Sequence, residues 1–236
     1  KTISENYAKV FIAYLDIFND DDVVIALTDH NYYHPYLLDC ILKEAKKTKV
    51  HVLPGVEINV GGVHMLVLCG KLAYSKTTYS DTIKQFLSQI GVHNRKDENG
   101  VLCLSDKSYK DVIQEINNTG ALLIYAHCNS TKGLLQERAK TDRGHLAAHF
   151  NAQDFNILQS SSKESANHAI GLIENNSSLK SKYAFTTGTD ARSLKDILQP
   201  DYQGNYCWIK ADPTFEGLKQ IVYEPAERIK ITVTNP

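Results

Sequence analysis

Residues Ile25–Cys40 read IALTDHNYYHPYLLDC, and this stretch decides the class of the fold. Its first part is apolar and typical of a strand, it turns polar at Thr28-Asp29-His30-Asn31, and a helical pattern follows from Pro35. A strand followed at once by a helix is the repeating unit of α/β proteins. The aspartate and histidine at the strand's end have two readings: a polar turn, with Asp29 capping the next helix, or part of a metal site.

The same alternation continues along the chain. Apolar and β-branched runs predict strands at residues 22–28, 51–53, 56–60, 63–70, 120–128, 155–160, 183–190 and 205–210. Helical spacing predicts helices at residues 4–18, 35–48, 80–91, 108–118 and 213–224. Gly61-Gly62 predicts a hairpin turn, and Pro54-Gly55 predicts a break between two short strands. Strands that alternate with helices indicate an α/β fold with a mostly parallel sheet.

Composition limits the class of protein. The chain has 236 residues, of which 42% are hydrophobic and 22% charged, and this suits one globular domain. A net charge of -1 argues against a chain that is basic throughout, as many nucleic-acid and membrane binders are. No apolar run approaches the roughly 20 residues that span a bilayer, the start lacks a signal-peptide pattern, and no P-loop motif is present.

The cysteines favour a reduced protein. The five cysteines are scattered, odd in number and form no C-x-x-C pair. That pattern does not resemble a disulfide framework, so we expect free thiols and a cytoplasmic location.

Metal-ligand residue types follow successive strands. They are His30, Glu57, His64, His127 and Asp190. The carboxyl ends of barrel strands meet at one face, and histidine mixed with carboxylate suits zinc, manganese or iron better than calcium. Taken alone, each histidine is more often a hydrogen-bonded core or surface residue. Glu57 differs, because an unpaired carboxylate inside an apolar run is costly and needs a cation or a hydrogen-bond network.

Four segments together resemble the PHP (polymerase and histidinol phosphatase) domain family. They are ALTDHN (26–31), LPGVEINVGGVHMLVL (53–68), LLIYAHC (122–128) and TTGTDAR (186–192), and they occur in the family's order. The resemblance implies a distorted (β/α)7 PHP barrel, divalent metal ions (Mn, Zn or Fe) and phosphoester hydrolysis. It implies that Glu57 bridges the first two metals, His64 and His127 bind the second, Asp190 binds the first, and His30 binds a third.

The tail of the chain resembles a longer protein type. The segment WIKADPTFEGLKQIVYEPAERIKI (208–231) is similar to the part that follows the PHP domain in TrlF-type proteins, which fuse it to an AAA/SMC-like ATPase. We therefore expect one PHP-like domain over residues 1–236, in which residues 205–236 form a closing strand and helix. The plain reading of the same tail is that Phe215, Leu218 and Ile221 close the barrel.

Two positions depart from the family pattern. The family opens with a His-x-His motif, and none precedes Ile25, so the domain is expected to lack its first strand. Arg192 stands where the family has a histidine. Because an arginine stays protonated, it cannot bind a metal, but it can clamp a substrate phosphate. Two metals are then expected, and His30 is either a ligand or a neighbour of the ligands or substrate.

A basic segment follows His127. Lys132, Arg138, Lys140 and Arg143 either line a phosphate backbone or belong to a solvated loop, and His145 and His149 have helical spacing. The favoured function is a metal-dependent nuclease that works with an ATPase module in DNA repair or defence. Its catalytic residues are Glu57, Asp190 and Arg192, and Arg192 and Lys132 bind the substrate phosphate. The alternatives are a small-molecule phosphomonoesterase and a non-catalytic PHP module that regulates a partner ATPase.

Overall fold

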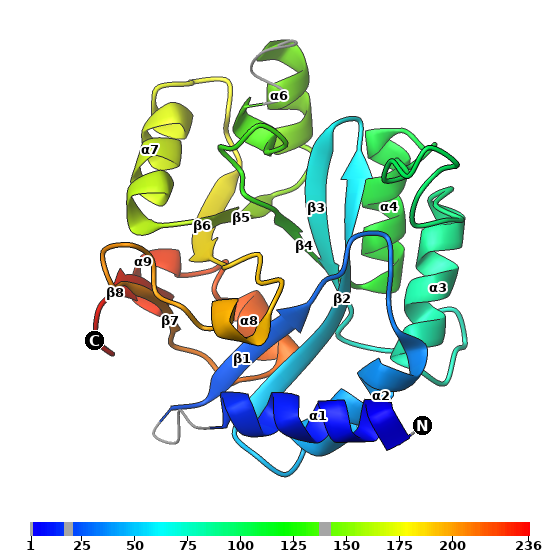
Figure 1. The fold of residues 1–236 in the computed structure, drawn as a ribbon. Helices are drawn as coiled ribbons and strands as arrows, with labels where there is room; N and C mark the ends of the chain where they lie inside the picture. Colours follow the sequence, from blue (N-terminus) through cyan, green and yellow to red (C-terminus); the bar gives the residue numbers. More distant parts are fainter. Residues whose placement is uncertain (1, 17–20, 137–142) are drawn as a thin grey trace. The chain divides into compact units, whose positions relative to one another are not determined.

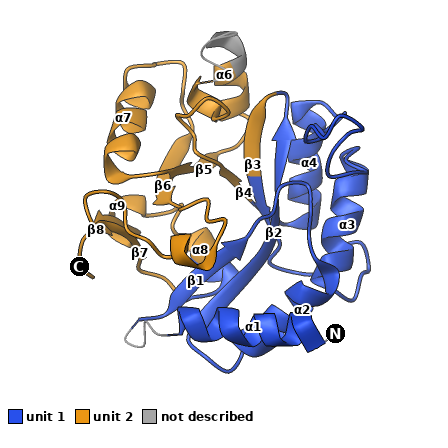
Figure 2. Ribbon diagram, in the orientation of Figure 1, with its two compact units in different colours: residues 1–61, 66–122, 212–217 blue, residues 62–65, 123–211, 218–236 orange. Residues whose placement is uncertain are grey.

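The computed structural model describes residues 2–16, 21–136 and 143–236, and for residues 143–145 it describes the backbone alone. The chain forms two compact units (Figures 1 and 2). Unit 1 comprises residues 1–61, 66–122 and 212–217, and unit 2 comprises residues 62–65, 123–211 and 218–236. The single PHP-like domain expected over residues 1–236 stays a prediction.

Among the described residues, unit 1 holds the first strands and the helices from α1 to α4. Its strands are β1 (Val23–Leu27), β2 (Val50–Val60) and part of β3 (Val63–Leu68). Its helices are α1 (Thr2–Leu15), α2 (Pro35–Ala45), α3 (Tyr79–Gln89) and α4 (Tyr109–Thr119). β1 pairs with β2 in parallel, and α2 and α3 both contact β2.

Local signals explain where these helices begin and end. The hydroxyls of Thr78 and Ser108 accept hydrogen bonds from the first turns of α3 and α4. Gly120 ends α4 in the left-handed conformation that glycine adopts without strain. For α2 the cap is His34, not Asp29, because His34 Nδ1 lies 3.4 Å from the backbone nitrogen of Leu37. Asp29 is instead part of the turn after β1.

The Pro54-Gly55 pair does not break the strand. β2 is continuous from Val50 to Val60, so the prediction of two short strands was wrong. Pro54 of β2 is paired with Leu27, the last residue of β1. Its carbonyl accepts a hydrogen bond from the backbone N–H of Cys69 at 2.8 Å. A Cβ on Gly55 would stand 2.7 Å from the carbonyl oxygen of Val67, so glycine lets β3 approach closely.

The hairpin turn expected at Gly61-Gly62 is confirmed. Both glycines have positive φ, 55° and 90°, as a tight two-residue hairpin requires. The turn connects β2 to β3, and β3 is shared, since residues 63–65 belong to unit 2 and residues 66–68 to unit 1.

Unit 2 holds a second run of strands. β4 (Leu122–Tyr125), β5 (Phe155–Ser160) and β6 (Lys182–Thr187) pair in parallel in chain order, and the hydrogen-bonded order of the sheet is β1-β2-β3-β4-β5-β6. Helices α6 (Arg143–Phe150) and α7 (Lys163–Glu174) lie between these strands in the chain, and α7 contacts β5. α7 was not predicted from the sequence, although its buried residues Ala166, Ala169 and Ile173 have helical spacing.

The tail forms an antiparallel pair. β7 (Tyr206–Ile209) pairs with β8 (Ile229–Thr232), and α8 (Phe215–Gln220) and α9 (Pro225–Arg228) lie between them in the chain, after the short 3-10 helix η1 (Leu194–Asp196). Phe215, Leu218 and Ile221 are buried, as the plain reading of the tail expected. The predicted helix ends earlier than expected, at Gln220, and β8 was not predicted.

The mixed α/β class is confirmed, and the strands and helices occur in the predicted order. The seven-unit barrel stays a prediction. In the part of the chain that the structure describes, no helix is both long and apolar enough to cross a membrane.

Candidate metal centre

Unit 1 contains a pair of candidate ligands, His30 and Glu57. After β1 ends at Leu27, an isolated parallel bridge joins His30 to Glu57 in the same register as the β1–β2 ladder. His30 Nδ1 lies 3.6 Å from Glu57 Oε2, and these side chains are 12% and 15% exposed. The register therefore places an imidazole and a carboxylate side by side in a largely buried position, where a carboxylate needs a positive partner.

Asn31 holds this pair in place. Its backbone N–H donates to the carbonyl of Glu57 at 2.8 Å, and the N–H of Glu57 donates to the carbonyl of Asp29 at 3.2 Å. Asn31 is 4% exposed and has a φ of 53°, and asparagine tolerates this left-handed conformation better than most residues. The turn after β1 is thus fixed to β2 on both sides of His30.

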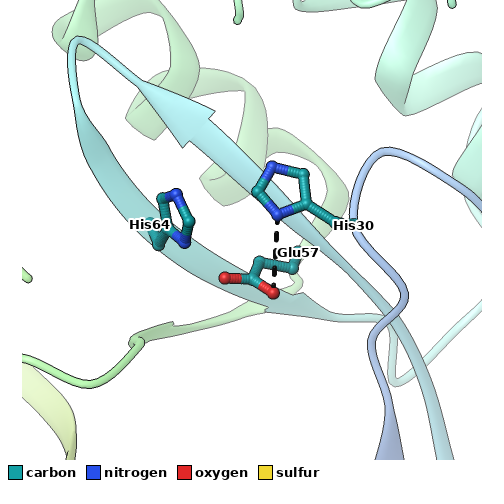
Figure 3. A group of neighbouring side chains, drawn as sticks. All are labelled: His30, Glu57 and His64. Carbon is teal, nitrogen blue, oxygen red and sulfur yellow. Dashed lines mark ion pairs between the residues drawn. The ribbon is translucent and has the colours of Figure 1, made fainter. Parts of the chain in front are cut away.

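The β2–β3 hairpin supplies a third ligand type. His64 lies on β3, across the Gly61-Gly62 turn from Glu57. One ligand atom from each of His30, Glu57 and His64 lies within 4.8 Å of the others, and all three residues are partly buried (Figure 3). Two ligands of one zinc-like ion, each about 2.0–2.3 Å from it, stand at most about 4.6 Å apart, so small side-chain movements suffice for joint binding.

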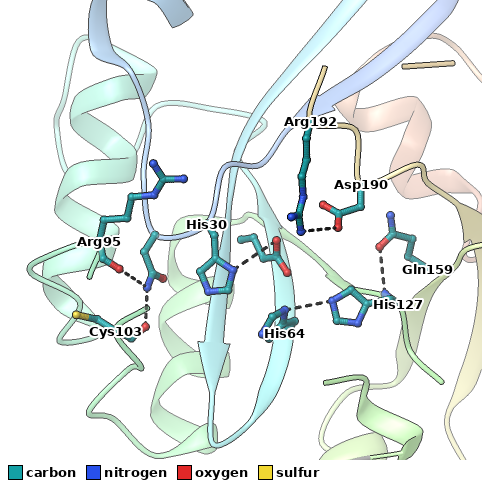
Figure 4. Close-up of polar contacts among 10 residues, drawn as sticks. His30, His64, Arg95, Cys103, His127, Gln159, Asp190 and Arg192 are labelled. Carbon is teal, nitrogen blue, oxygen red and sulfur yellow. Dashed lines mark hydrogen bonds and ion pairs between the residues drawn. The ribbon is translucent and has the colours of Figure 1, made fainter. Parts of the chain in front are cut away.

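Unit 2 contains a histidine pair. His127 follows β4, and its Nε2 lies 3.1 Å from Nδ1 of His64 (Figure 4). The rings meet edge to face, with centroids 4.9 Å apart. Two ring nitrogens at this distance either share a proton or direct their lone pairs at one cation.

Ser130 and Gln159 orient His127. The Ser130 hydroxyl lies 2.7 Å from His127 Nδ1, and the backbone N–H of His127 donates to Gln159 Oε1 at 3.1 Å. A polar partner on one ring nitrogen fixes the tautomer and the ring plane of a metal-binding histidine. Neither residue was predicted from the sequence to belong to the site. Ser130 had a weak signal, since it follows His127 by three positions, whereas Gln159 comes from another strand and had none.

Asp190 and Arg192 form a separate, exposed pair. Their side chains are 70% and 87% exposed, and Arg192 Nη2 lies 3.5 Å from Asp190 Oδ2 (Figure 4). Figure 4 draws them near His127 and Gln159. Among the described residues, the possible metal-binding group consists of His30, Glu57 and His64, and it includes neither Asp190 nor His127. The structure therefore brings His30, Glu57 and His64 together, pairs His64 with His127, and pairs Asp190 with Arg192.

Some of these positions have unusual backbone angles, as do Tyr74, Ser75 and Leu198 elsewhere. Among the described residues, six non-glycine residues have positive φ, and these include Asn31, His127 at 31° and Asp190 at 46°. Such conformations cost about 1–3 kcal/mol each and concentrate at functional sites. Strain at three of the strand-end turns agrees with a site selected for the direction of its side chains.

The basic segment is only partly described. The carbonyl of Lys132 accepts a hydrogen bond from the backbone of His64 at 3.0 Å, which anchors the loop after β4. The predicted basic residues Arg138 and Lys140 lie outside the described residues, as do the side chains of Arg143 and His145.

The donor set fits a divalent metal. His30 and His64 offer imidazole nitrogens and Glu57 offers a carboxylate, which is the mixture that zinc, manganese and iron accept. Calcium would require a site made of oxygen atoms.

Comparison with known proteins gives structural matches alone. No family model matches the sequence. No curated protein matches it either. A structure from Bifidobacterium adolescentis, described as a candidate metal-dependent phosphoesterase, is similar with a TM-score of 0.50 and 12% identity, over 79% of this chain and 82% of that chain.

Two further structures are less similar. A two-domain protein from Bacteroides vulgatus that contains a predicted PHP-like metal-dependent phosphoesterase has a TM-score of 0.49 and 15% identity, over 93% of this chain and 58% of that chain. An amidohydrolase from Chromobacterium violaceum, with bound sulfate and no metal, has a TM-score of 0.44 and 14% identity, over 71% and 76% of the two chains. The likeness to the Bifidobacterium structure shows that this chain has the fold of that protein.

Proposed function

We propose that this chain is a metal-dependent phosphoesterase of the PHP type. The observation that carries the proposal is the His30–Glu57–His64 group, whose ligand atoms lie within 4.8 Å of one another at positions selected by strand register. The likeness of the fold to a candidate metal-dependent phosphoesterase supports it, as does the resemblance of four segments of the sequence to PHP motifs.

The proposed ligands are His30, Glu57, His64, His127 and Asp190. A bound divalent ion lowers the pKa of its water and offsets the negative charge that develops on a phosphoryl group. Glu57 contributes negative charge from a position that is 15% exposed, where few waters compete for it. Ser130 holds His127 by Nδ1, which leaves Nε2 directed at His64. Arg192 and Lys132 are the proposed contacts for the substrate phosphate.

We propose a nucleic-acid phosphodiester as the substrate, and an ATPase module as the partner in repair or defence. Support comes from the resemblance of residues 208–231 to the segment that precedes such modules. A small-molecule phosphomonoesterase is the competing function. The two differ in whether bis(p-nitrophenyl) phosphate or p-nitrophenyl phosphate is the better substrate.

The first test is Glu57→Gln. The amide keeps the size of the side chain but removes its charge, so we expect kcat for bis(p-nitrophenyl) phosphate with manganese to fall at least about 100-fold. Calorimetric titration with manganese should show a matching loss of affinity, and the circular dichroism spectrum should not change.

Glu98→Gln is the matched control, because Glu98 is exposed and lies outside the candidate site. Wild-type rates in the control together with loss in Glu57→Gln would support the proposal. Hydrolysis and manganese affinity at wild-type levels in Glu57→Gln would rule out Glu57 as a ligand.

A further inference from the structure

A short hairpin-like arm lies beside the His30–Glu57 pair, within unit 1. Residues 95–103 form this arm. The backbone N–H of Cys103 donates to Arg95 at 3.1 Å, and Lys96 and Leu102 form an antiparallel bridge. At the tip, the carboxylate of Asp97 accepts two backbone N–H groups, from residues 99 and 101, each at 2.9 Å.

Asn31 clamps the base of the arm. Its side-chain amide donates to the carbonyl of Cys103 at 2.5 Å and approaches the carbonyl of Arg95 at 3.5 Å (Figure 4). A second anchor follows, where Ser105 donates its N–H to Asn59 at 3.0 Å and its hydroxyl to Ile90 at 2.6 Å. Because Asn31 is also bonded to Glu57, one buried residue connects the arm to the proposed metal ligands.

The arm places a cation over an aromatic ring. The guanidinium carbon of Arg95 lies 5.2 Å from the centre of the Tyr32 ring, and Tyr32 follows His30 by two positions. Tyr32 is 39% exposed and stacks on Tyr33 with ring centres 6.3 Å apart. A cation over an aromatic ring is attracted to its face, so the ring orients the guanidinium.

The charges around Arg95 leave it available to an anion. In the part of the chain that the structure describes, the Arg95 guanidinium forms no ion pair with a carboxylate, and Lys96 adds a second positive charge beside it. The Asp97 carboxylate is engaged by the turn, and Glu98 is exposed at the tip. An exposed arginine held in one orientation by an aromatic ring is suited to bidentate binding of phosphate.

We propose that Arg95, oriented by Tyr32, binds a backbone phosphate of single-stranded nucleic acid next to the phosphate that is hydrolysed. This inference rests on the proposed function and specifies its substrate. Aromatic rings combined with basic side chains are the usual means of binding single strands without sequence preference. Arg95 and Tyr32 then determine preference for a chain of phosphates over a single phosphoester, while the metal ligands act on either.

The test measures binding and hydrolysis separately. Binding of a fluorescein-labelled 12-nucleotide single-stranded DNA is followed by anisotropy in EDTA at several salt concentrations. Arg95→Ala should raise Kd about 10-fold, since a hydrogen bond to a charged group contributes about 1.5–3 kcal/mol. It should also reduce the slope of log K against log salt by about 0.7. Tyr32→Leu should raise Kd in the same direction, and Arg95→Lys should lie between wild type and Arg95→Ala.

Two comparisons show where the effect acts. Lys84→Ala removes an exposed positive charge from α3 and should leave Kd within about 2-fold of wild type, because a charge away from the bound strand is screened by salt. Hydrolysis of bis(p-nitrophenyl) phosphate, which has no second phosphate, should be unchanged in Arg95→Ala, whereas KM for the oligonucleotide should rise.

The outcomes separate this inference from the proposed function. Wild-type binding in Arg95→Ala, or an equal loss in Lys84→Ala, would overturn the role of Arg95. The role of Arg95 would also be overturned if the wild-type protein hydrolysed bis(p-nitrophenyl) phosphate but did not bind the oligonucleotide. That result would leave the proposed phosphoesterase activity supported. Loss of binding in Arg95→Ala with no hydrolysis of any phosphoester would support the binding role and overturn the enzyme.

Discussion

Arg192 and Arg95 are two exposed arginines with different surroundings. Arg192 lies 3.5 Å from the carboxylate of Asp190, and Arg95 lies over the ring of Tyr32. Asp190 is a proposed metal ligand and Arg192 a proposed contact of the reacting phosphate, whereas Arg95 lies on the arm that Asn31 holds. The two arginines should therefore affect different substrates.

For Arg192→Ala, we expect a higher KM for bis(p-nitrophenyl) phosphate, by about 10-fold, because a charged hydrogen bond to the reacting phosphate is lost. Manganese content should not change, since arginine is no ligand. The free energy of unfolding should change by less than about 1 kcal/mol, because an exposed ion pair contributes little. Steady-state kinetics, metal analysis and urea unfolding check the three expectations.

Unchanged kinetics in Arg192→Ala would show that this arginine has no part in binding substrate. Loss of manganese would show that it supports the ligands through Asp190. Arg192→His gives a further comparison, because it restores the residue type that the PHP pattern has at this position, and metal analysis then shows whether an extra ion binds.

At the scale of elements, β2 connects the fold to the site. This strand carries Glu57, pairs with β1 on one side, and leads through the hairpin to His64. Gly55 lies two positions before Glu57, where a Cβ would meet the carbonyl oxygen of Val67 at 2.7 Å and a Leu68 methyl at 2.8 Å. Backbone on a neighbouring strand cannot move aside cheaply, so the close approach of β3 depends on this glycine.

For Gly55→Ala we expect a loss of about 1–3 kcal/mol in the free energy of unfolding, which is typical of overpacking. Gly171→Ala is the matched control: it lies in α7 with no atom within 4 Å of an added Cβ. Alanine there should raise stability by about 0.5–1 kcal/mol. Urea unfolding of both variants checks the pair, and equal effects of the two changes would contradict the close contact at Gly55.

At the scale of the whole molecule, the buried thiols report on the two units. All five cysteines are free, and Cys69 lies in unit 1 while Cys128 lies in unit 2. Burial raises the pKa of Cys69 to about 12. Burial also raises the pKa of Cys128 to about 11, although the Ser160 hydroxyl opposes the shift. Because the thiolate is the reactive form, neither should react at pH 8 in the folded protein.

We expect Cys69 and Cys128 to become reactive together as urea is added at pH 8. The physical reason is that β3 supplies residues to both units, so unfolding either one removes part of a strand from the other. Labelling with a thiol reagent, followed by mass spectrometry of the peptides, measures each position. Partly exposed Cys103, on the arm, should react before unfolding and serves as the internal control. Well-separated midpoints for Cys69 and Cys128 would show that the units unfold independently.

The sequence by itself determined the class of the fold and most of its elements. Strands such as β1 and β5 and helices such as α3 and α4 were predicted because their signals are local: apolar period, hydroxyl caps, and Gly120 at the end of α4. The Gly61-Gly62 turn was predicted for the same reason. Residue types also indicated His30, Glu57 and His64. The expected placement at strand ends was right for His30 alone, because Glu57 lies within β2 and His64 within β3, across a hairpin.

Only the tertiary structure decided the remaining features. The strand through Pro54 and Gly55 is continuous because β3 pairs there, and no local signal reports a partner strand. Ser130 and Gln159 are recognised by their contacts with His127, and Asn31 by its bonds to Cys103 and Glu57. Most of these contacts join segments that lie far apart in the chain, and the energy that selects them comes from buried hydrogen bonds and close backbone approach, which arise only once the chain has folded.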